Sequence, residues 1–62
     1  MARDYLSLVI DDVSGDDVYE IRHSSTCDMI AEIDAKKMFK EQQRYMPRLR
    51  KIKNWHVETV AL

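Results

Sequence analysis

The sequence predicts an α+β domain of the order β-β-α-β, in which one helix packs on one face of a three-stranded antiparallel sheet. Three observations lead to this fold class. Apolar and polar residues alternate over three short segments, which is typical of strands with one buried face. A single segment, 26–46, lacks Gly and Pro and has an apolar stripe at helical spacing. The 62 residues leave room for one domain only, 1–62.

The first two strands are predicted to form a hairpin over residues 4–23. Residues alternate in character over 5–11 and again over 18–23. Gly15, the only glycine of the chain, lies between these two runs. A turn at this place needs a positive φ, which glycine adopts without steric cost. The spacing is therefore typical of an antiparallel hairpin.

The helix is predicted over residues 26–46. Ser25 and Asp28 form an approximate capping box at its start, and Pro47 cannot continue it. The apolar stripe of this helix is broad enough to cover a sheet. Its members are Cys27, Ile30, Ala31, Ala35, Met38, Phe39, Gln42, Tyr45 and Met46.

A basic connector is predicted over residues 47–54, and a third alternating strand over 55–61. The economical arrangement is an antiparallel sheet with the helix across one face. The other face is expected to be partly apolar and to carry Tyr5, Val9 and Val18 or their alternates. An exposed apolar face on a small domain typically marks a contact site.

The net charge of −1 conceals a division of charge between the two halves of the chain. Residues 1–35 contain two basic and nine acidic residues, whereas residues 36–62 contain eight basic and two acidic residues. Such a division creates a dipolar field that matters for association more than for folding. We expect an acidic end and a basic end on one body, a layout that favours docking over catalysis.

The location of the protein is predicted from two features. The single cysteine, Cys27, excludes an internal disulfide and indicates a reducing compartment. The apolar run 6–10 is too short for a signal peptide, and no stretch approaches the roughly 20 apolar residues of a membrane span. We therefore expect a cytoplasmic protein that does not engage a membrane.

We predict no enzyme, no metal site and no cofactor. His23, Cys27 and His56 could supply metal ligands, but their spacing matches no standard zinc pattern. Cys27 with a histidine could form a nucleophile and its base, but 62 residues leave little scope for a pocket of about 300 Å³. The acidic turn 11–17 lacks the ligand order and the closing glutamate of an EF-hand loop.

The predicted contact residues lie on the helix face away from the apolar stripe. Two apolar residues occur there among basic ones, and a domain of this size is only marginally stable alone, so we expect assembly. The partner is predicted to be a host protein or a second copy in a homodimer. The predicted contact residues are Met29, Ile33, Lys37, Lys40 and Arg44.

Nucleic-acid binding through the basic run 36–53 is the alternative. Eight positive charges occur within its 18 residues, with Phe39, Tyr45 and Trp55 nearby, which suits phosphate contacts and base stacking. The isoelectric point of about 6.0 is lower than nucleic-acid modules tend to have. A solvated basic face without a dedicated partner would give the same pattern. The residues specific to this alternative are Lys36, Arg48, Arg50, Lys51 and Lys53.

The order of elements resembles that of small phage-encoded proteins. The segment 4–12, a short turn, the segment 18–21, a capped helix and the segment 56–60 follow one another as in the podophage inhibitors of bacterial RNA polymerase and the Bacillus phage inhibitors of uracil-DNA glycosylase. The acidic hairpin turn is similar to that of the second kind, whereas the basic second half differs from its acidic, DNA-imitating character. The resemblance implies a small non-enzymatic protein that binds and modulates a larger host protein.

Overall fold

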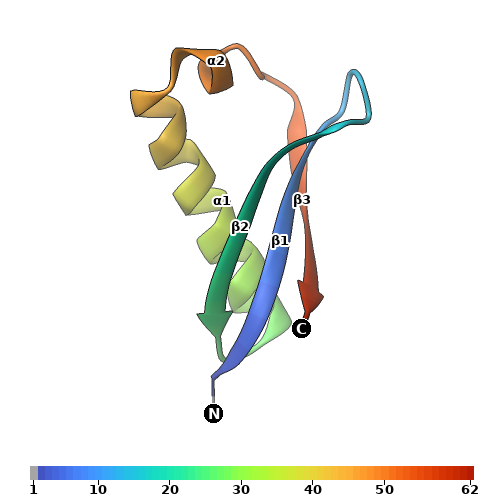
Figure 1. The fold of residues 1–62 in the computed structure, drawn as a ribbon, viewed down its shortest axis with the longest axis vertical. Helices are drawn as coiled ribbons and strands as arrows, with labels where there is room; N and C mark the ends of the chain where they lie inside the picture. The colour runs from blue at the N-terminus through green and yellow to red at the C-terminus, as the bar shows by residue number, and fades with distance from the viewer. Residues whose placement is uncertain (1) are drawn as a thin grey trace.

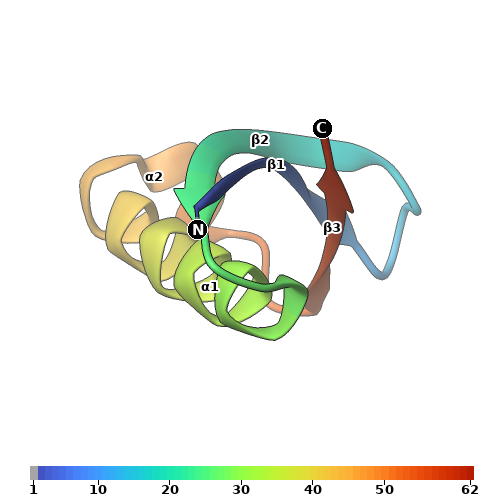
Figure 2. The same cartoon turned by 90° about the horizontal axis from the view of Figure 1, so that it is seen from below.

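The alternating segments form strands and the segment free of Gly and Pro forms a helix, so the predicted α+β fold is confirmed. The computed structural model describes residues 2–62. The elements are β1 (Arg3–Asp11), β2 (Asp17–Ser25), α1 (Asp28–Tyr45), α2 (Pro47–Arg50) and β3 (Trp55–Ala61). The strands make one layer, and α1 makes a second layer on one face of the sheet (Figure 1 and Figure 2).

β1 is the central strand of the sheet and runs antiparallel to both neighbours, in the order β2-β1-β3. In the turn between β1 and β2, the N–H of Gly15 donates a hydrogen bond to the carbonyl of Asp11 at 2.7 Å. Gly15 has a φ of 79°, as the sequence predicted. Because β1 contacts both edge strands, its side chains form the middle row of each sheet face.

The helix covers the face of β1 that carries Tyr5 and Val9. The sequence left open whether the uncovered face carries Tyr5, Val9 and Val18 or their alternates, and the structure shows the alternates. Tyr5 is 1% exposed, Val9 is fully buried, and Val18 packs against the core. The residues of β1 that lie on the uncovered face are the alternates Leu6, Leu8 and Ile10.

The register of the sheet explains which face is covered. Val9 lies opposite Tyr19 of β2 and Val57 of β3, so its face collects large apolar side chains from all three strands. An irregularity between Val9 and Ile10 leaves Val18 as an extra residue in β2. A β-bulge of this kind redirects a side chain, and here it turns Val18 toward the core.

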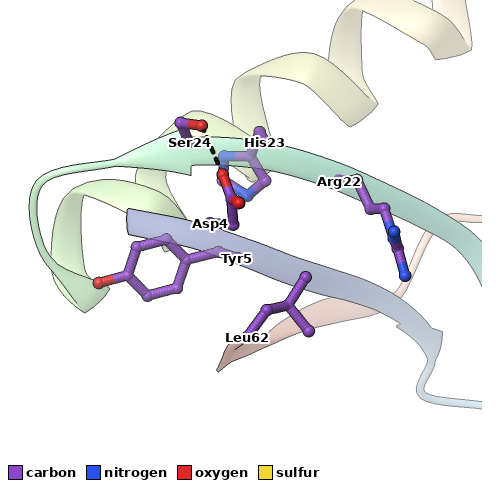
Figure 3. Close-up of a pocket in the computed structure, with 6 residues that line it drawn as sticks. All are labelled: Asp4, Tyr5, Arg22, His23, Ser24 and Leu62. Carbon is purple, nitrogen blue, oxygen red and sulfur yellow. Dashed lines mark hydrogen bonds between the residues drawn. The ribbon is translucent and has the colours of Figure 1, made fainter. Parts of the chain in front are cut away.

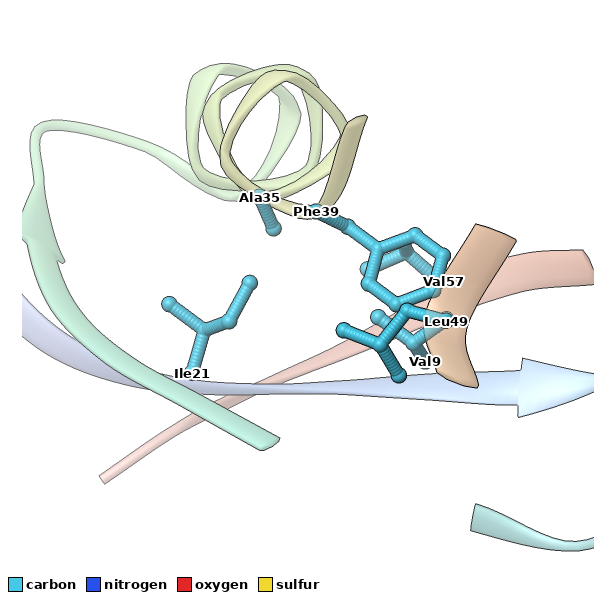
Figure 4. Close-up of a cluster of buried hydrophobic side chains, with 6 residues drawn as sticks. All are labelled: Val9, Ile21, Ala35, Phe39, Leu49 and Val57. Atoms are coloured by element: carbon cyan, nitrogen blue, oxygen red, sulfur yellow. The ribbon is translucent and has the colours of Figure 1, made fainter. Parts of the chain in front are cut away.

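The hydrophobic core lies between the sheet and the middle of α1 (Figure 4). The Phe39 ring lies edge-on to Trp55, with centroids 4.8 Å apart, and tilted to Tyr19 at 5.8 Å. Phe39 thus joins α1 to both edge strands. The buried residues of this cluster are Val9, Ile21, Ala35, Phe39, Leu49 and Val57.

Only part of the predicted apolar stripe of α1 is buried. Ala31, Ala35 and Phe39, spaced four residues apart, are its buried residues. Three strands about 4.8 Å apart make a narrow sheet, which covers a narrower arc of the helix than the stripe spans. The stripe residues that are exposed instead are Cys27, Ile30, Met38 and Tyr45. Neither α1 nor any other helix within residues 2–62 is long and apolar enough to span a membrane.

The predicted capping box is not formed. α1 begins at Asp28, and its N-cap residue Cys27 makes no side-chain hydrogen bond to the helix. Ser25 is the last residue of β2, and its buried hydroxyl has no hydrogen-bond partner among residues 2–62. β2 continues two residues beyond the predicted end of the hairpin, which takes Ser25 into the sheet and away from the helix start.

α1 ends at Tyr45, as Pro47 predicted, and the connector begins with the short helix α2. The side-chain amide of Gln43 donates to the carbonyl oxygens of Leu49 at 2.9 Å and Ile52 at 3.1 Å. Leu49 is 1% exposed and belongs to the core. The connector is therefore fastened to α1 and is not a free basic arm.

The acidic turn and the basic connector lie at the same end of the molecule (Figure 1). The N–H of Asp12 in the turn donates to the carbonyl of Asn54 in the connector at 2.9 Å. The predicted separation into an acidic end and a basic end is therefore wrong. The excess of acidic residues lies on the strands and the hairpin turn, the connector carries basic residues only, and α1 carries four acidic and four basic residues.

Candidate interaction surfaces

The sheet face that α1 does not cover, called the open face below, carries apolar side chains of β1 and of the C-terminal part of the chain. Leu6, Leu8 and Ile10 are half-buried, because side chains of the edge strands flank them. Val60 is 52% exposed and Leu62 is 60% exposed. Alternation along the strands places all five on the same face. A contiguous exposed apolar surface is typical of a contact site.

The margins of the open face are acidic. Leu8 lies opposite Glu20 of β2 and Glu58 of β3, so a carboxylate flanks it on each side. Asp4 adds a third carboxylate near the start of β1, and Arg22 is the one arginine among these side chains. Within residues 2–62, neither Glu20 nor Arg22 forms an ion pair. The open face therefore presents an apolar centre between carboxylates, of which Glu20 forms no ion pair within residues 2–62, whereas Glu58 is held by His56 and Asp4 by Ser24.

A shallow hollow of about 280 Å³ lies near the start of β1. The hydroxyl of Ser24 donates to the carboxylate of Asp4 at 2.9 Å across this hollow, and Leu62 and Arg22 lie along it (Figure 3). Its lining combines one carboxylate, one guanidinium and one apolar side chain. It continues the mixed character of the open face and does not form a separate enclosed pocket.

The helix face opposite the sheet, called the outer stripe below, holds the predicted contact residues. Met29 is 72% exposed and Ile33 is 45% exposed. At 100° per residue, the five positions fall within an arc of about 80° that points away from the buried line of the helix. Its three cations are exposed and form no ion pair within residues 2–62. The outer stripe consists of Met29, Ile33, Lys37, Lys40 and Arg44.

His56 joins the hairpin turn to β3. Its Nδ1 lies 2.5 Å from the carboxylate of Asp12, and its Nε2 lies 3.1 Å from that of Glu58. The hydrogen bond with Asp12, and then that with Glu58, raise the pKa of His56 above its usual value. No local sequence pattern predicts this cluster, because Asp12 and His56 are 44 residues apart and meet only through the register of β1 and β3.

A buried hydrogen-bonded trio lies under the N-terminal half of α1. The Ser7 hydroxyl lies 2.8 Å from Nε2 of His23 and 3.0 Å from the hydroxyl of Thr59. A serine beside a histidine is the arrangement of an activated nucleophile, but Ser7 is fully buried and no acid orients Nδ1 of His23. The trio links all three strands beneath the helix, which is a structural role.

Cys27, His23 and His56, the candidates for metal or thiol chemistry, do not form a common site. Cys27 is exposed at the start of α1, not packed under it, and His23 is engaged with Ser7. His56 is engaged with two carboxylates. No group of three or more His, Cys, Asp or Glu side chains within residues 2–62 is placed to hold a metal ion.

The basic residues predicted for nucleic-acid binding are all exposed, but the aromatic residues near them differ in role. Phe39 is fully buried, and Trp55 packs against it, so both rings serve the core. Tyr45, which the sequence placed on the buried stripe, is 70% exposed and lies beside Arg44 in the chain. The exposed basic residues of this set are Lys36, Arg48, Arg50, Lys51 and Lys53.

Comparison of the chain with protein-family models, with curated proteins and with solved structures gives no match. The resemblance to small phage-encoded inhibitors therefore stays a prediction from the order of elements. The open face and the outer stripe are defined by the geometry of this chain alone.

Proposed function

We propose that this chain is a non-enzymatic protein-interaction module that binds a partner protein through its open face and its outer stripe. One observation carries the proposal: the two-layer fold leaves the apolar centre of its sheet uncovered on one side. A sheet with one apolar face normally buries it against another layer. A partner protein would supply that layer, and the excess of carboxylates at the margin would select a partner with basic side chains.

Two kinds of partner fit this role. The order of elements shared with small phage-encoded inhibitors supports a larger host protein whose activity the chain modulates. The small size of the domain supports a second copy, because assembly adds buried surface that 62 residues alone supply sparingly. Both would act in the cytoplasm, as the single cysteine suggests.

Photo-crosslinking in the native cells tests the proposal. A photoreactive amino acid is placed at Leu8 on the open face, at Ile33 on the outer stripe, or at Val13, a control in the hairpin turn that is 80% exposed. We expect a discrete crosslinked protein from Leu8 and Ile33 and none from Val13. The same background from all three positions would contradict the proposed function.

The crosslinked protein then has to bind in purified form. A buried charge in the open face leaves the partner's apolar groups facing an unpaired carboxylate, which is costly. Leu8→Asp is therefore expected to weaken binding at least about tenfold, or about 1.4 kcal/mol. Val13→Asp should bind as the unmodified chain does.

Nucleic-acid binding is a second candidate, and the exposure of Tyr45 within the basic segment favours it. An exposed ring beside cations can stack on a base while the cations contact phosphates. We expect any such affinity to fall steeply with the logarithm of salt concentration. Absence of binding to single-stranded or duplex nucleic acid at about 0.1 M salt would remove this candidate.

A further inference from the structure

We infer that the partner of the open face is the outer stripe of a second copy of this chain, in a head-to-tail contact. The inference rests on the proposed interaction function and names its partner. Two unpartnered surfaces lie on opposite sides of the molecule, because α1 covers one face of the sheet and turns its outer stripe away from it (Figure 2). One copy therefore offers both halves of the contact.

The charges of the two surfaces are complementary. The open face carries Asp4, Glu20 and Glu58 against Arg22 and His56, whose ring is hydrogen-bonded to Asp12 and Glu58, whereas the outer stripe carries three cations and no carboxylate. Two outer stripes would set cations against cations, and two open faces would set carboxylates against carboxylates. Like charges juxtaposed across an interface cost several kcal/mol, so a contact between unlike surfaces is favoured.

The dimensions of the two surfaces agree. From Met29 to Arg44 the outer stripe rises about 22 Å, at 1.5 Å per residue. From Asp4 to Ile10 the middle row of the open face extends about 20 Å, at about 3.4 Å per residue. A helix about 10 Å wide also fits across three strands. The covered side of the same sheet accepts one helix in the same way, namely α1.

In a simple stack of two copies, the direction of α1 places apolar residues over apolar residues and cations over carboxylates. α1 begins near the start of β1. Further along the helix, Phe39 contacts Trp55, which lies opposite Asp11 at the end of β1. α1 therefore runs from the start of β1 toward its end (Figure 1). A second copy placed on the first in the same orientation then lays its helix along the open face from the start of β1 to its end.

In that stack each part of the outer stripe meets a matching part of the open face. Met29 and Ile33 lie over the end that holds Leu6, Val60 and Leu62. Lys37 and Lys40 follow about 6–10 Å further along, at 1.5 Å per residue from Ile33. The carboxylates beside Leu8 lie two residues beyond Leu6, or about 7 Å. The cations therefore arrive over Glu20, which forms no ion pair within residues 2–62, and over Glu58, whose only ion-pair partner within those residues is His56 at 3.1 Å.

A head-to-tail contact repeats without closing, so assembly should proceed beyond two chains. The mass of the wild-type protein, measured by sedimentation, is expected to rise with concentration past twice 7.4 kDa. This rise should be smaller at about 0.5 M salt than at about 0.05 M, because exposed charges are screened. A wild-type mass that stays at one chain, or that stops at two, would overturn the inference.

Two blocking variants give the decisive test. Val60→Asp blocks the open face where the apolar Met29 and Ile33 are expected to lie and leaves the outer stripe intact, whereas Ile33→Asp does the reverse. Each alone is expected to remain at one chain, and an equimolar mixture is expected to form a complex of two chains and no larger, since only one contact remains possible. A mixture that stays at one chain, or a single variant that assembles like the wild type, would overturn the inference.

Controls separate loss of contact from loss of folding. Val13→Asp lies outside both surfaces and should assemble like the wild type. If Val60→Asp does not fold by circular dichroism, Leu62→Asp replaces it, because Leu62 is 60% exposed on the same face. A mixture that fails to pair while crosslinks from Leu8 to another protein persist would overturn self-association and leave the proposed function standing.

Discussion

His56 lies between two carboxylates that come from different parts of the chain, Asp12 of the turn and Glu58 of β3. Its pKa is raised mainly by the hydrogen bond with Asp12. In an NMR titration of the ring protons, we expect a midpoint above 6.5. Asp12→Asn should lower this midpoint more than Glu58→Gln does. Equal midpoints in all three proteins would show that neither carboxylate holds the ring.

The raised pKa also sets the sign of a stability change with pH. Protonated His56 is favoured in the folded state, so its contribution is fully present below pH 6.5 and is lost as pH rises through the raised pKa. Urea unfolding should therefore show a lower free energy of unfolding above this window than below it. His56→Gln removes the titrating group, and the part of the pH dependence that belongs to His56 should disappear with it.

Gly15 is a second place where one residue sets local structure. Its φ of 79° is unfavourable for side chains, yet no atom lies within 4 Å of the position that a Cβ would take. Gly15→Ala should therefore cost only the backbone strain, about 1–2 kcal/mol. Gly15→Asn should cost less, since Asn tolerates this conformation better. Equal urea midpoints for both variants and the wild type would contradict this account.

Among the elements, the connector depends on one side chain of α1. Gln43 donates to the carbonyls of Leu49 and Ile52. Gln43→Ala leaves both acceptors without this donor, for an expected loss of about 1–3 kcal/mol of unfolding free energy. Gln43→Glu should be worse at pH 7, because a carboxylate then faces two carbonyl oxygens, and should recover when the carboxyl is protonated in acid. A Glu variant that is as stable as wild type at pH 7 would refute this.

Successive parts of α1 rest on different layers of side chains. The middle of the helix contributes Ala35 and Phe39 to the hydrophobic core, whereas its first turns lie over the polar trio of Ser7, His23 and Thr59. Few buried apolar contacts permit local opening. In hydrogen exchange, amides of the first two turns should therefore exchange faster than those of the middle turns. Uniform protection along the helix would mean that the polar layer holds it equally well.

The strands show what a single sequence can and cannot specify. Alternation located all three, and the third matches its predicted bounds of 55–61. Alternation within β1 could not decide which face is covered, because both rows contain large apolar residues. That choice depends on Ile21 and Val57, which reach the side of Val9 only through the register. Ser25 was misplaced for a related reason, since pairing with Arg3 extends β2 into the predicted helix cap.

At the scale of the whole molecule, the candidate surfaces differ in how far the sequence predicted them. The outer stripe follows from the helical period alone, and the exposure of Met29 and Ile33 agrees with it. The open face required the register, which sets Glu20 and Glu58 beside Leu8. The distribution of charge along the chain predicted an acidic end and a basic end of the molecule. The hydrogen bond between Asp12 and Asn54 instead brings the acidic turn next to the basic connector. The charge difference therefore lies between the acidic sheet with its turn and the basic connector, because α1 carries four acidic and four basic residues.

Phe39 connects every layer of the molecule, so its replacement tests the fold as a whole. It is fully buried and contacts aromatic rings of both edge strands. Phe39→Ala should cost about 3–5 kcal/mol. A chain of 62 residues has roughly 3–9 kcal/mol of unfolding free energy, so this variant should be largely or wholly unfolded in urea-free buffer by circular dichroism.

Two comparisons separate loss of the ring from loss of volume and from general sensitivity of α1. Phe39→Leu keeps most of the volume and loses the two aromatic pairs, worth about 0.5–1.5 kcal/mol each, so it should fold with a lower urea midpoint. Met38→Ala changes the neighbouring residue, which is 38% exposed, and should shift the midpoint much less. If Phe39→Ala and Met38→Ala unfold at the same midpoint, the core does not depend on Phe39, and the contact between α1 and the two edge strands must be maintained by other residues.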